Sequence, residues 1–483
     1  MSFFVYDLGF LIIVSILGSI FLYKRRKNLN REMGIFFLYR TKVGIKLIER
    51  VSKKYKKLLN SIKYAIIALG YLLMAGIIYL LSESVYSYVK YPLVAELINA
   101  PPVFPVIPYF PKIFGVESMF PPFYFTYFII AFVVVAVVHE FAHGIYARLY
   151  KIKIKSTGFA FLGPLLAGAF VEQDEKQMGK AKKVDQMTIL AAGVFANVIL
   201  TIIAFLLLWF IFTINFVPGG AIFNAYSSSQ INISSISDIG GIEVLNPTNQ
   251  ELISIINGGM PVDLTINNGE EVNLTRLSTD GEDYYFDSEK FKAGLEQGGE
   301  KILVYGDYPA INAGMQGEII WVQDEKIGTY NDLSKVMPNY APGQKINVKT
   351  SYKGEIFDYN LILAEDPNQN GRAIMGIGNT LSSMLKIEDR FTFFKVPLTK
   401  YNYKSGFLYF LYYLVFWVFL LNLLVAFFNM IPCLIFDGGR FFYLTVWGIT
   451  KNEKIARKMY KWAGIIILAS VVLLLVVWLL RKF

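Results

Sequence analysis

The chain has few of the residues from which soluble enzymes build disulfides, metal sites and a charged surface. Its 483 residues include one cysteine, Cys433, which excludes an intramolecular disulfide and a cysteine-based metal cluster. Charged residues make up 17% of the chain, whereas soluble proteins contain about 25%, so a protein that is soluble throughout is not expected. Hydrophobic residues make up 54%, which excludes disorder throughout. Only two histidines are present, His139 and His143, and they stand four residues apart.

Six apolar stretches predict membrane spans, because each is long enough to cross a bilayer core of about 30 Å as a helix of roughly 20 residues. The predicted spans are 4–23, 62–82, 122–147, 188–216, 407–431 and 461–480. The first stretch contains Asp7 and lacks a basic start, so it predicts a retained span and not a cleaved signal peptide. The expected fold class is a polytopic α-helical membrane protein.

Three basic loops predict the orientation of these spans. Residues 24–63 contain fourteen Lys or Arg, residues 148–187 contain eight, and residues 432–461 contain six. Basic loops stay in the cytoplasm, which places the N-terminus outside; Arg481 and Lys482, at the outer end, disagree but are outweighed. The net charge of +10 therefore reflects membrane orientation, and no nucleic-acid partner is expected, since the basic residues flank spans.

A hydrophilic insert separates the fourth and fifth spans. Residues 217–406 contain 24 acidic and 15 basic residues and have the pattern of short strands broken by Gly, Asn and Asp turns. The segment 242–253, followed by an alternating run at 261–276, parallels the segment 326–333, followed by alternation at 345–363. Each copy predicts a strand, a turn, a short helix and a hairpin. The sequence therefore predicts two tandem α+β modules, on the extracytoplasmic side.

A further apolar stretch, 158–170, is too short to span a membrane. Basic residues precede it, and acidic residues follow it from Glu172 onward. The spacing of its Gly and Pro residues predicts a strand hairpin that dips into the membrane as a re-entrant element. Such backbone is tolerated only where it is buried in protein or lines a wet cavity.

The two histidines lie in the sequence Val138-His139-Glu140-Phe141-Ala142-His143, at the end of the third span. On a helix, residues four apart share one face, so both imidazoles can point at one ion with Glu140 beside them. Catalytic zinc uses three protein ligands and a water, and a glutamate can accept that water's proton. Two hydrogen-bonded packing histidines are the alternative, but ionisable residues inside a span are costly and usually functional.

Asp437 is the expected third ligand, since the chain has no further histidine. It lies in the segment 429–440, which begins at the end of the fifth span. The third and fifth spans both run from outside to inside, which brings Asp437 to the same depth as the histidines. Alone, Asp437 with Gly438 is equally typical of a turn that caps a helix.

These motifs resemble the site-2 protease family of intramembrane zinc metalloproteases. The segment 139–143 is similar to the zinc helix of that family, and 429–440 is similar to its Asn-Pro-Asp-Gly motif. The resemblance implies a single Zn2+ as cofactor and Glu140 as the catalytic base. The ligands that it implies are His139, His143 and Asp437.

The resemblance extends to the fourth span and to the insert. Gly193-Val-Phe-Ala-Asn197 is similar to the family's Gly-Pro-x-x-Asn element, with Val194 in place of Pro. Asn197 and Asn429 are expected to hold the substrate or to stabilise the oxyanion, whereas Cys433 is expected to be a buried apolar residue. Residues 308–333 resemble a PDZ domain, which accepts an extended peptide as an added strand, and 217–300 is a weaker PDZ-like copy. A role as a spacer is the alternative for these modules.

The expected function is hydrolysis of a peptide bond within or near a transmembrane segment of membrane-protein substrates. The expected partners are these substrates, the lipid bilayer, and a peptide or substrate ectodomain at the PDZ-like modules; the oligomeric state stays open. An inactive membrane scaffold and a metal or solute transporter are the alternatives, although a transporter is expected to show paired broken helices. The expected division is 1–121 (N-terminal membrane region), 122–216 (first part of the protease core), 217–300 (weaker module), 301–385 (PDZ domain) and 386–483 (second part of the core).

Overall fold

A computed structural model of the chain describes residues 3–32, 36–90, 101–117, 120–223, 225–267, 271–296, 298–378, 398–433 and 435–482. These residues form two compact units. The first comprises Met1–Asn215 and Ser405–Phe483, and the second comprises Phe216–Lys404. The first contains the apolar helices and the second is rich in strands. The predicted boundary between residues 385 and 386 lies outside the described residues.

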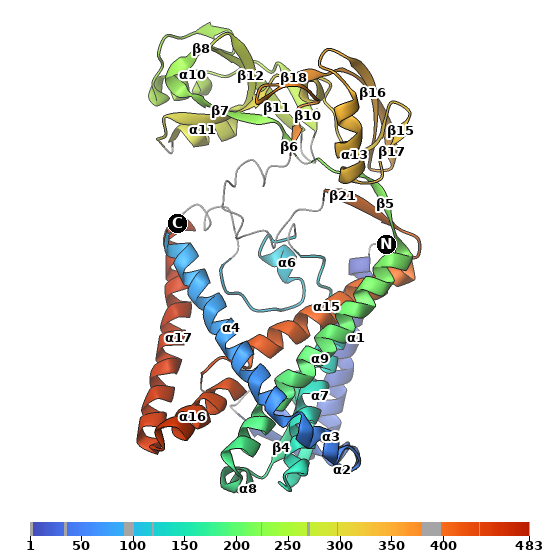
Figure 1. The fold of residues 1–483 in the computed structure, drawn as a ribbon, viewed down its shortest axis with the longest axis vertical. Helices are drawn as coiled ribbons and strands as arrows, with labels where there is room; N and C mark the ends of the chain where they lie inside the picture. The colour runs from blue at the N-terminus through green and yellow to red at the C-terminus, as the bar shows by residue number, and fades with distance from the viewer. Residues whose placement is uncertain are drawn as a thin grey trace. The chain divides into compact units, whose positions relative to one another are not determined.

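Among the described residues, six helices of the first unit are long and apolar enough to cross a membrane. They are α1 (Phe3–Arg25), α4 (Lys63–Lys90), α7 (Phe125–Leu149), α9 (Lys183–Asn215), α15 (Gly406–Phe428) and α17 (Glu453–Lys482) (Figure 1). Each predicted span corresponds to one of these helices, but the ends differ because capping as well as hydrophobicity sets them. The side chain of Asn452 accepts hydrogen bonds from the backbone of Lys454 (3.0 Å) and Ile455 (3.3 Å), so α17 begins well before residue 461.

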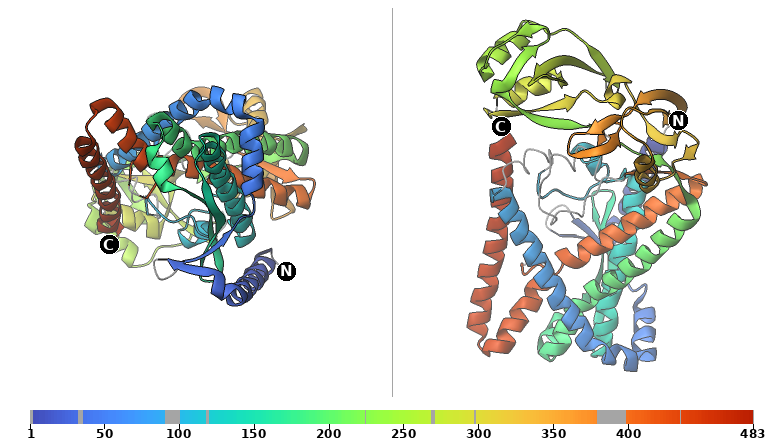
Figure 2. Two further views of the ribbon diagram at one scale, coloured as in Figure 1. Left: turned by 90° about the horizontal axis from the view of Figure 1, so that it is seen from below. Right: turned by 45° about the horizontal axis from the view of Figure 1, so that its top comes forward.

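Helix α9 packs against α4, α7 and α15 (Figure 2). Lipid is as apolar as these side chains, so close van der Waals packing holds the helices together. At the contact between α7 and α15, the indole of Trp417 is fully buried and its ring centroid lies 4.0 Å from that of Phe123. Helix α15, which leads to the turn before Asp437, is therefore in direct contact with the helix that carries both histidines.

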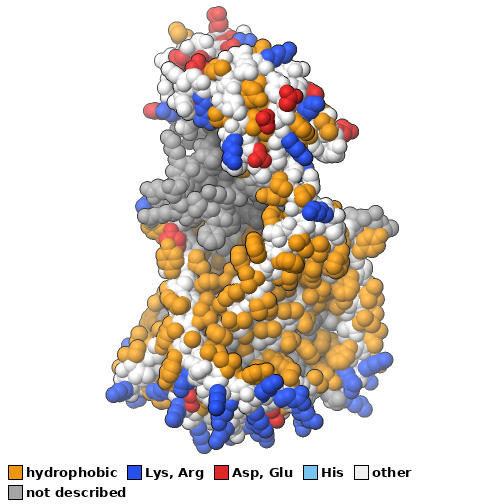
Figure 3. All heavy atoms as spheres, turned by 45° about the vertical axis from the view of Figure 1, so that its right-hand side comes forward, with side chains coloured by type: hydrophobic (Ala, Val, Ile, Leu, Met, Phe, Trp, Pro, Cys, Tyr) orange, Lys and Arg blue, Asp and Glu red, His pale blue; other side chains and the backbone are white. Residues whose placement is uncertain are grey.

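The outer surface of the first unit divides into an apolar band and a basic end. Figure 3 shows hydrophobic side chains along its sides and Lys and Arg gathered at one end. The short helices α2 (Ile45–Lys54), α3 (Lys56–Ser61) and α8 (Glu175–Lys180) lie at that end (Figure 1). The three loops that the sequence identified as basic thus share one end of the unit.

A four-stranded antiparallel sheet belongs to the first unit. Its strands are β1 (Leu29–Glu32), β2 (Phe36–Thr41), β3 (Ile154–Leu162) and β4 (Leu165–Gln173), in that order, so β4 is an edge strand of the described sheet. The predicted hairpin at 158–170 is thus a strand pair, and it extends further at both ends. Strands β1 and β2 were expected to be part of a loop. Thr41 of β2 pairs with Thr157, 116 residues later, and no local sequence pattern records such a pairing.

The second unit contains two larger sheets. The seven-stranded sheet comprises β7 (Ser228–Asn232), β8 (Ile236–Ile239), β9 (Ile242–Glu243), β10 (Leu264–Asn267), β11 (Glu271–Thr279), β12 (Glu282–Asp287) and β13 (Lys301–Gly306). The six-stranded sheet comprises β5 (Phe216–Ala221), β14 (Glu318–Val322), β15 (Glu325–Lys326), β16 (Lys345–Tyr352), β17 (Glu355–Ile362) and β21 (Thr399–Tyr403).

The repeat expected from the sequence is present in both sheets. Helix α10 (Asn249–Asn257) follows β9 and precedes the β10–β11 hairpin, and α13 (Tyr330–Val336) follows β15 and precedes the β16–β17 hairpin. Both helices begin with a capping box: Thr248 pairs with Glu251 in α10, and Thr329 pairs with Asp332 in α13. The same local signals therefore build the same element order twice.

The two modules are nested in the chain and are not in tandem. Strand β5 belongs to the second sheet, the chain then forms the whole first sheet, and it returns to the second sheet after β13. The chain enters the first sheet near Ser227 and leaves it near Gly306. These two points are hydrogen-bonded, because the backbone N–H of Gly306 donates to the carbonyl of Ser227 at 3.0 Å. The sheets thus do not divide at residue 300, since β13 pairs with both β12 and β7.

Candidate metal centre

Helix α7 carries both histidines on one face near its C-terminal end. His139 and His143 are each 6% exposed, and their ring centroids lie 4.6 Å apart. The spacing of four residues places them one turn apart on the helix, as the sequence predicted. Glu140 lies beside them, and one potential ligand atom from each of the three residues lies within 4.8 Å of the others. The three residues can therefore meet around a single ion.

The Nε2 atoms of the histidines and one oxygen of Asp437 form a small triangle. The two Nε2 atoms lie 3.0 Å apart, and Oδ2 of Asp437 lies 3.3 Å from His139 and 3.2 Å from His143. The structure thus brings Asp437 to the histidines, at the depth expected from the course of the spans. A zinc ion with ligands at about 2.0–2.1 Å in tetrahedral array separates them by about 3.4 Å, so the spacing suits that ion.

The remaining ring nitrogens face hydrogen-bond partners on α9. Nδ1 of His143 donates to the carbonyl oxygen of Ile189 at 2.7 Å. Nδ2 of Asn197 lies 3.1 Å from Nδ1 of His139, and Oδ1 of the same amide is buried without a partner among the described residues. Exchanging the nitrogen and oxygen positions of this amide gives Oδ1 a partner. With Oδ1 turned toward the ring, Nδ1–H of His139 donates to it. Both imidazoles then direct an Nε2 lone pair into the triangle, which is the arrangement that a cation stabilises.

Gly193 allows α9 to approach the histidines. A β-carbon at this position would lie 2.5 Å from Nε2 of His143 and 2.7 Å from Nε2 of His139. Any other residue therefore collides with the two ring atoms that point at the metal position. The motif around Gly193 was noticed in the sequence, but its steric function is visible only in three dimensions.

A tight turn between α15 and α16 (Asp437–Thr450) sets the position of Asp437. The backbone N–H of Gly438 donates to the carbonyl of Asn429 at 2.7 Å. A β-carbon on Gly438 would lie 2.3 Å from the carbonyl carbon of Met430, and one on Gly439 would lie 2.1 Å from the carbonyl oxygen of Cys433. The two glycines after Asp437 are thus required by close backbone packing, and the aspartate begins a helix that starts beside the histidines.

The carboxylate of Glu140 contacts the edge strand of the four-stranded sheet. The backbone N–H of Val171 in β4 donates to Oε2 of Glu140 at 2.9 Å. Strand β4 packs along α7, so the sheet orients the carboxylate beside the metal position. Backbone groups such as this N–H leave no signature in the sequence, and neither this contact nor the Ile189 carbonyl was predicted.

The two asparagines named from the sequence have different surroundings. Asn197 is fully buried and faces the imidazole of His139, so it orients a candidate ligand. Asn429 is partly exposed, and its Nδ2 lies 3.4 Å from Nε2 of His139. Cys433 is partly buried and contributes its backbone to the turn after α15. Of the two, Asn429 is therefore the better placed to reach a substrate.

Comparisons with known proteins agree with this geometry. The family model described as peptidase family M50 matches residues 127–476, a range that includes α7, α9 and the turn at Asp437. An uncharacterised protein of Methanocaldococcus jannaschii is 33% identical over 212 residues, which cover 42% of this chain. The chain spans about half the length of that relative, at 52%. The donors brought together here lie within the matched range.

Proposed function

The chain belongs to peptidase family M50, and from this premise we propose that it is an intramembrane zinc metalloprotease. The substrate is a membrane protein, and the bond that is hydrolysed lies within or near one of its transmembrane segments. The observation that carries the proposal is the triangle of His139, His143 and Asp437, with Glu140 beside it, in which both histidines lie on α7, a helix long and apolar enough to cross a membrane.

Each residue of the centre has a chemical task in this proposal. His139, His143 and Asp437 hold a single Zn2+, which when bound supplies Lewis acidity that acidifies water and polarises a carbonyl. Glu140 accepts a proton from the attacking water and returns it to the leaving amine. Its Oε2 atom is held by Val171, which leaves Oε1 to take the proton.

Strand β4 is the proposed docking edge for the substrate. The carbonyl groups of a transmembrane helix are engaged in internal hydrogen bonds, so the helix must unwind locally before attack. An unwound segment can pair with β4, an edge strand whose Val171 N–H already lies at Glu140. We expect Asn429, which is partly exposed and has its Nδ2 3.4 Å from Nε2 of His139, to hydrogen-bond the reacting carbonyl.

The orientation in the membrane is part of the proposal. Lys and Arg gather at the end of the first unit that contains α2, α3 and α8, and α7 runs toward that end, with both histidines in its last turns. Basic ends face the cytoplasm, so the active site lies near the cytoplasmic face. The N-terminus and the insert 217–406 then lie outside, and the β3–β4 hairpin enters the membrane as a re-entrant element.

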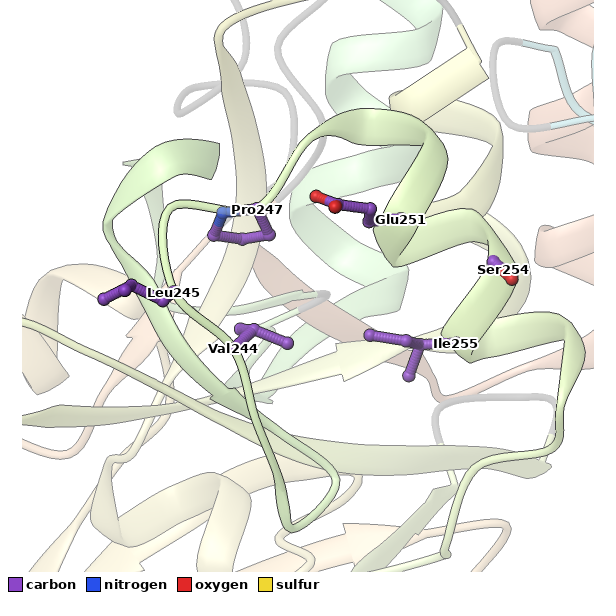
Figure 4. A pocket seen from close by; sticks show the side chains of 6 residues that line it. All are labelled: Val244, Leu245, Pro247, Glu251, Ser254 and Ile255. Carbon is purple, nitrogen blue, oxygen red and sulfur yellow. The ribbon is translucent and has the colours of Figure 1, made fainter.

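We propose that the insert binds an extended peptide or the ectodomain of the substrate. Its repeated strand, helix and hairpin order is the support for two PDZ-like modules. A cavity of about 380 Å3 lies beside α10 (Figure 4). It is lined by Val244, Leu245, Pro247, Glu251, Ser254 and Ile255. The edge strand β9 ends at this cavity, so a peptide added to β9 can place an apolar side chain in it.

The test compares the purified chain with Glu140→Gln on a single-span substrate in proteoliposomes. The proposal predicts cleavage by the unaltered chain and a loss of about 10^2- to 10^4-fold in Glu140→Gln, the contribution of a general base. Zinc content should stay the same in both. An inactive scaffold predicts no cleavage by either protein, and a transporter predicts zinc or solute flux without cleavage. Equal cleavage by both proteins would remove Glu140 from the mechanism.

A further inference from the structure

Asp7 is a buried carboxylate in a helix that otherwise presents an apolar surface. Among the described residues of α1 it alone is buried, at 1% exposure, while large apolar side chains such as Ile12 and Leu17 are more than half exposed. Ionisable groups in a membrane helix are costly unless they are satisfied by partners, and they usually have a function. We therefore expect the buried carboxylate of Asp7 to have both partners and a function.

The partners of Asp7 are the first residues of the helix that carries the histidines. The backbone N–H groups of Phe125 and Thr126 each donate to its carboxylate at 2.8 Å, and the Thr126 hydroxyl donates at 2.5 Å. The hydroxyl of Tyr109 donates at 2.6 Å. The residue at the N-cap position of α7, Tyr124, offers no side-chain hydrogen bond. Asp7 thus caps α7 from another helix, where a negative charge also suits the helix dipole.

The opposite end of α1 contacts the tip of the β3–β4 hairpin. A β-carbon on Gly18 would lie 2.0 Å from the carbonyl oxygen of Pro164, so helix and hairpin turn touch through their backbones. The ring of Phe21 lies 5.7 Å from that of Phe161 in β3 and 5.1 Å from that of Tyr39 in β2. Helix α1 therefore connects the start of α7 to the tip of the hairpin, a distance of about 16 Å along its axis.

We propose that Asp7 is a positioning residue for proteolysis: by capping α7 it fixes α1, and α1 fixes the hairpin on which the substrate is held. The hairpin reaches Glu140 through the N–H of Val171, so its placement sets the distance between the substrate strand and the base. The first span, α1, then has the role of holding the hairpin in place. Because few of its side chains are buried, the polar contacts of Asp7 hold it where apolar packing does not. This inference rests on the proposed function.

The first experiment measures the contact between α1 and the hairpin without any assay of activity. Cysteines replace Phe21 and Phe161 in a Cys433→Ser background, and a short thiol-bridging reagent joins them. We expect efficient bridging with Asp7 present and a yield lower by about fivefold or more with Asp7→Ala, since charged hydrogen bonds to the start of α7 are lost. Bridging that is equal in the two proteins overturns the proposal.

The second experiment measures proteolysis of a single-span substrate by the full chain. Asp7→Ala should lower kcat/KM by about tenfold, mainly through KM, with zinc content unchanged. Ser19→Ala, which alters an exposed hydroxyl bonded to its own helix, is the matched control and should have no effect. Bridging residues 21 and 161 in Asp7→Ala should restore the KM. An unchanged KM, or a bridge that restores nothing, contradicts the positioning role.

The two experiments separate this inference from the proposed function. If the unaltered chain cleaves no substrate, the proposed function fails, and the bridging yield still reports whether Asp7 fixes α1. If the chain cleaves and bridging is independent of Asp7, only the positioning role is lost.

Discussion

A β-carbon on Gly193 would lie 2.5 Å from Nε2 of His143, closer than any non-bonded carbon and nitrogen can approach. Because Gly193 has no side chain, the fourth span can pack directly against the two histidines. Gly193 is therefore as necessary to the centre as a ligand.

Gly193→Ala should therefore weaken zinc binding while the helix stays intact. Alanine favours a helix interior over glycine by about 1 kcal/mol, so α9 itself is not weakened, but the two Nε2 atoms must move apart. We expect zinc affinity to fall by at least about tenfold and cleavage to fall with it, as measured by competition with a chelating dye. Gly448→Ala, at a position with open space around it, is the control. Normal zinc affinity in Gly193→Ala would show that the rings do not lie against α9.

Asn197 should act on the metal through His139. Its amide lies 3.1 Å from Nδ1 of that ring, and loss of such a partner costs about 10- to 100-fold in metal affinity. Asn197→Ala should show this loss, and Asn197→Asp, which keeps an acceptor, should recover most of it. Asn422→Ala removes a buried amide from α15 that bonds the carbonyl of Val418 and should leave zinc affinity unchanged. A selective effect on substrate KM in Asn197→Ala would instead support a substrate contact.

Replacement of Asp437 should affect zinc binding far more than replacement of Cys433, the one thiol in the chain. Oδ2 of Asp437 lies within 3.3 Å of both Nε2 atoms, whereas Cys433 contributes backbone contacts to the neighbouring turn. Asp437→Asn replaces an anionic oxygen donor by a neutral one and should lower zinc affinity by more than about tenfold. Cys433→Ser should stay within about twofold of the unaltered chain. The reverse ranking would make the thiol the ligand.

Substrate pairing along β4 can be tested in the substrate backbone. If an unwound segment adds to β4, only alternate N–H groups of the substrate face the strand. Replacing one such N–H by N-methyl should lower kcat/KM by about two- to tenfold, the value of one hydrogen bond, and methylation of the intervening residues should have little effect. A series of singly N-methylated substrates measures this alternation. An equal effect at every position argues against strand addition.

The sequence allowed the apolar helices and the residues that meet at the centre to be predicted, for different reasons. Helices such as α7 and α9 have long apolar runs that determine them locally. His139 and His143 are the only histidines in the chain and share a helical turn. Asp437 was predicted to lie at the depth of the histidines because the third and fifth spans run in the same direction. The structure brings its Oδ2 to 3.2 Å from Nε2 of His143.

The features that were missed depend on contacts between distant segments. Strand β2 pairs with β3 more than a hundred residues later, and Asp7 caps a helix that begins at Phe125. Ile189 and Val171 act through backbone atoms, which every residue possesses. The nesting of the two modules follows from the pairing of β5 with β14, which lies beyond the whole first sheet in the chain, whereas the repeat in the sequence suggested a tandem order. None of these relationships has a local periodicity by which it could be recognised.

In the proposed mechanism, one zinc ion, held by His139, His143 and Asp437, is required for Glu140-dependent peptide hydrolysis. The most direct test removes metal from the purified chain with a chelator and adds zinc back in steps while cleavage of a single-span substrate is followed. We expect that cleavage is lost on chelation, that it rises in proportion to added zinc, and that it levels off at about one zinc per chain. Glu140→Gln should take up the same zinc without cleavage. Full cleavage by the metal-free chain would contradict the account.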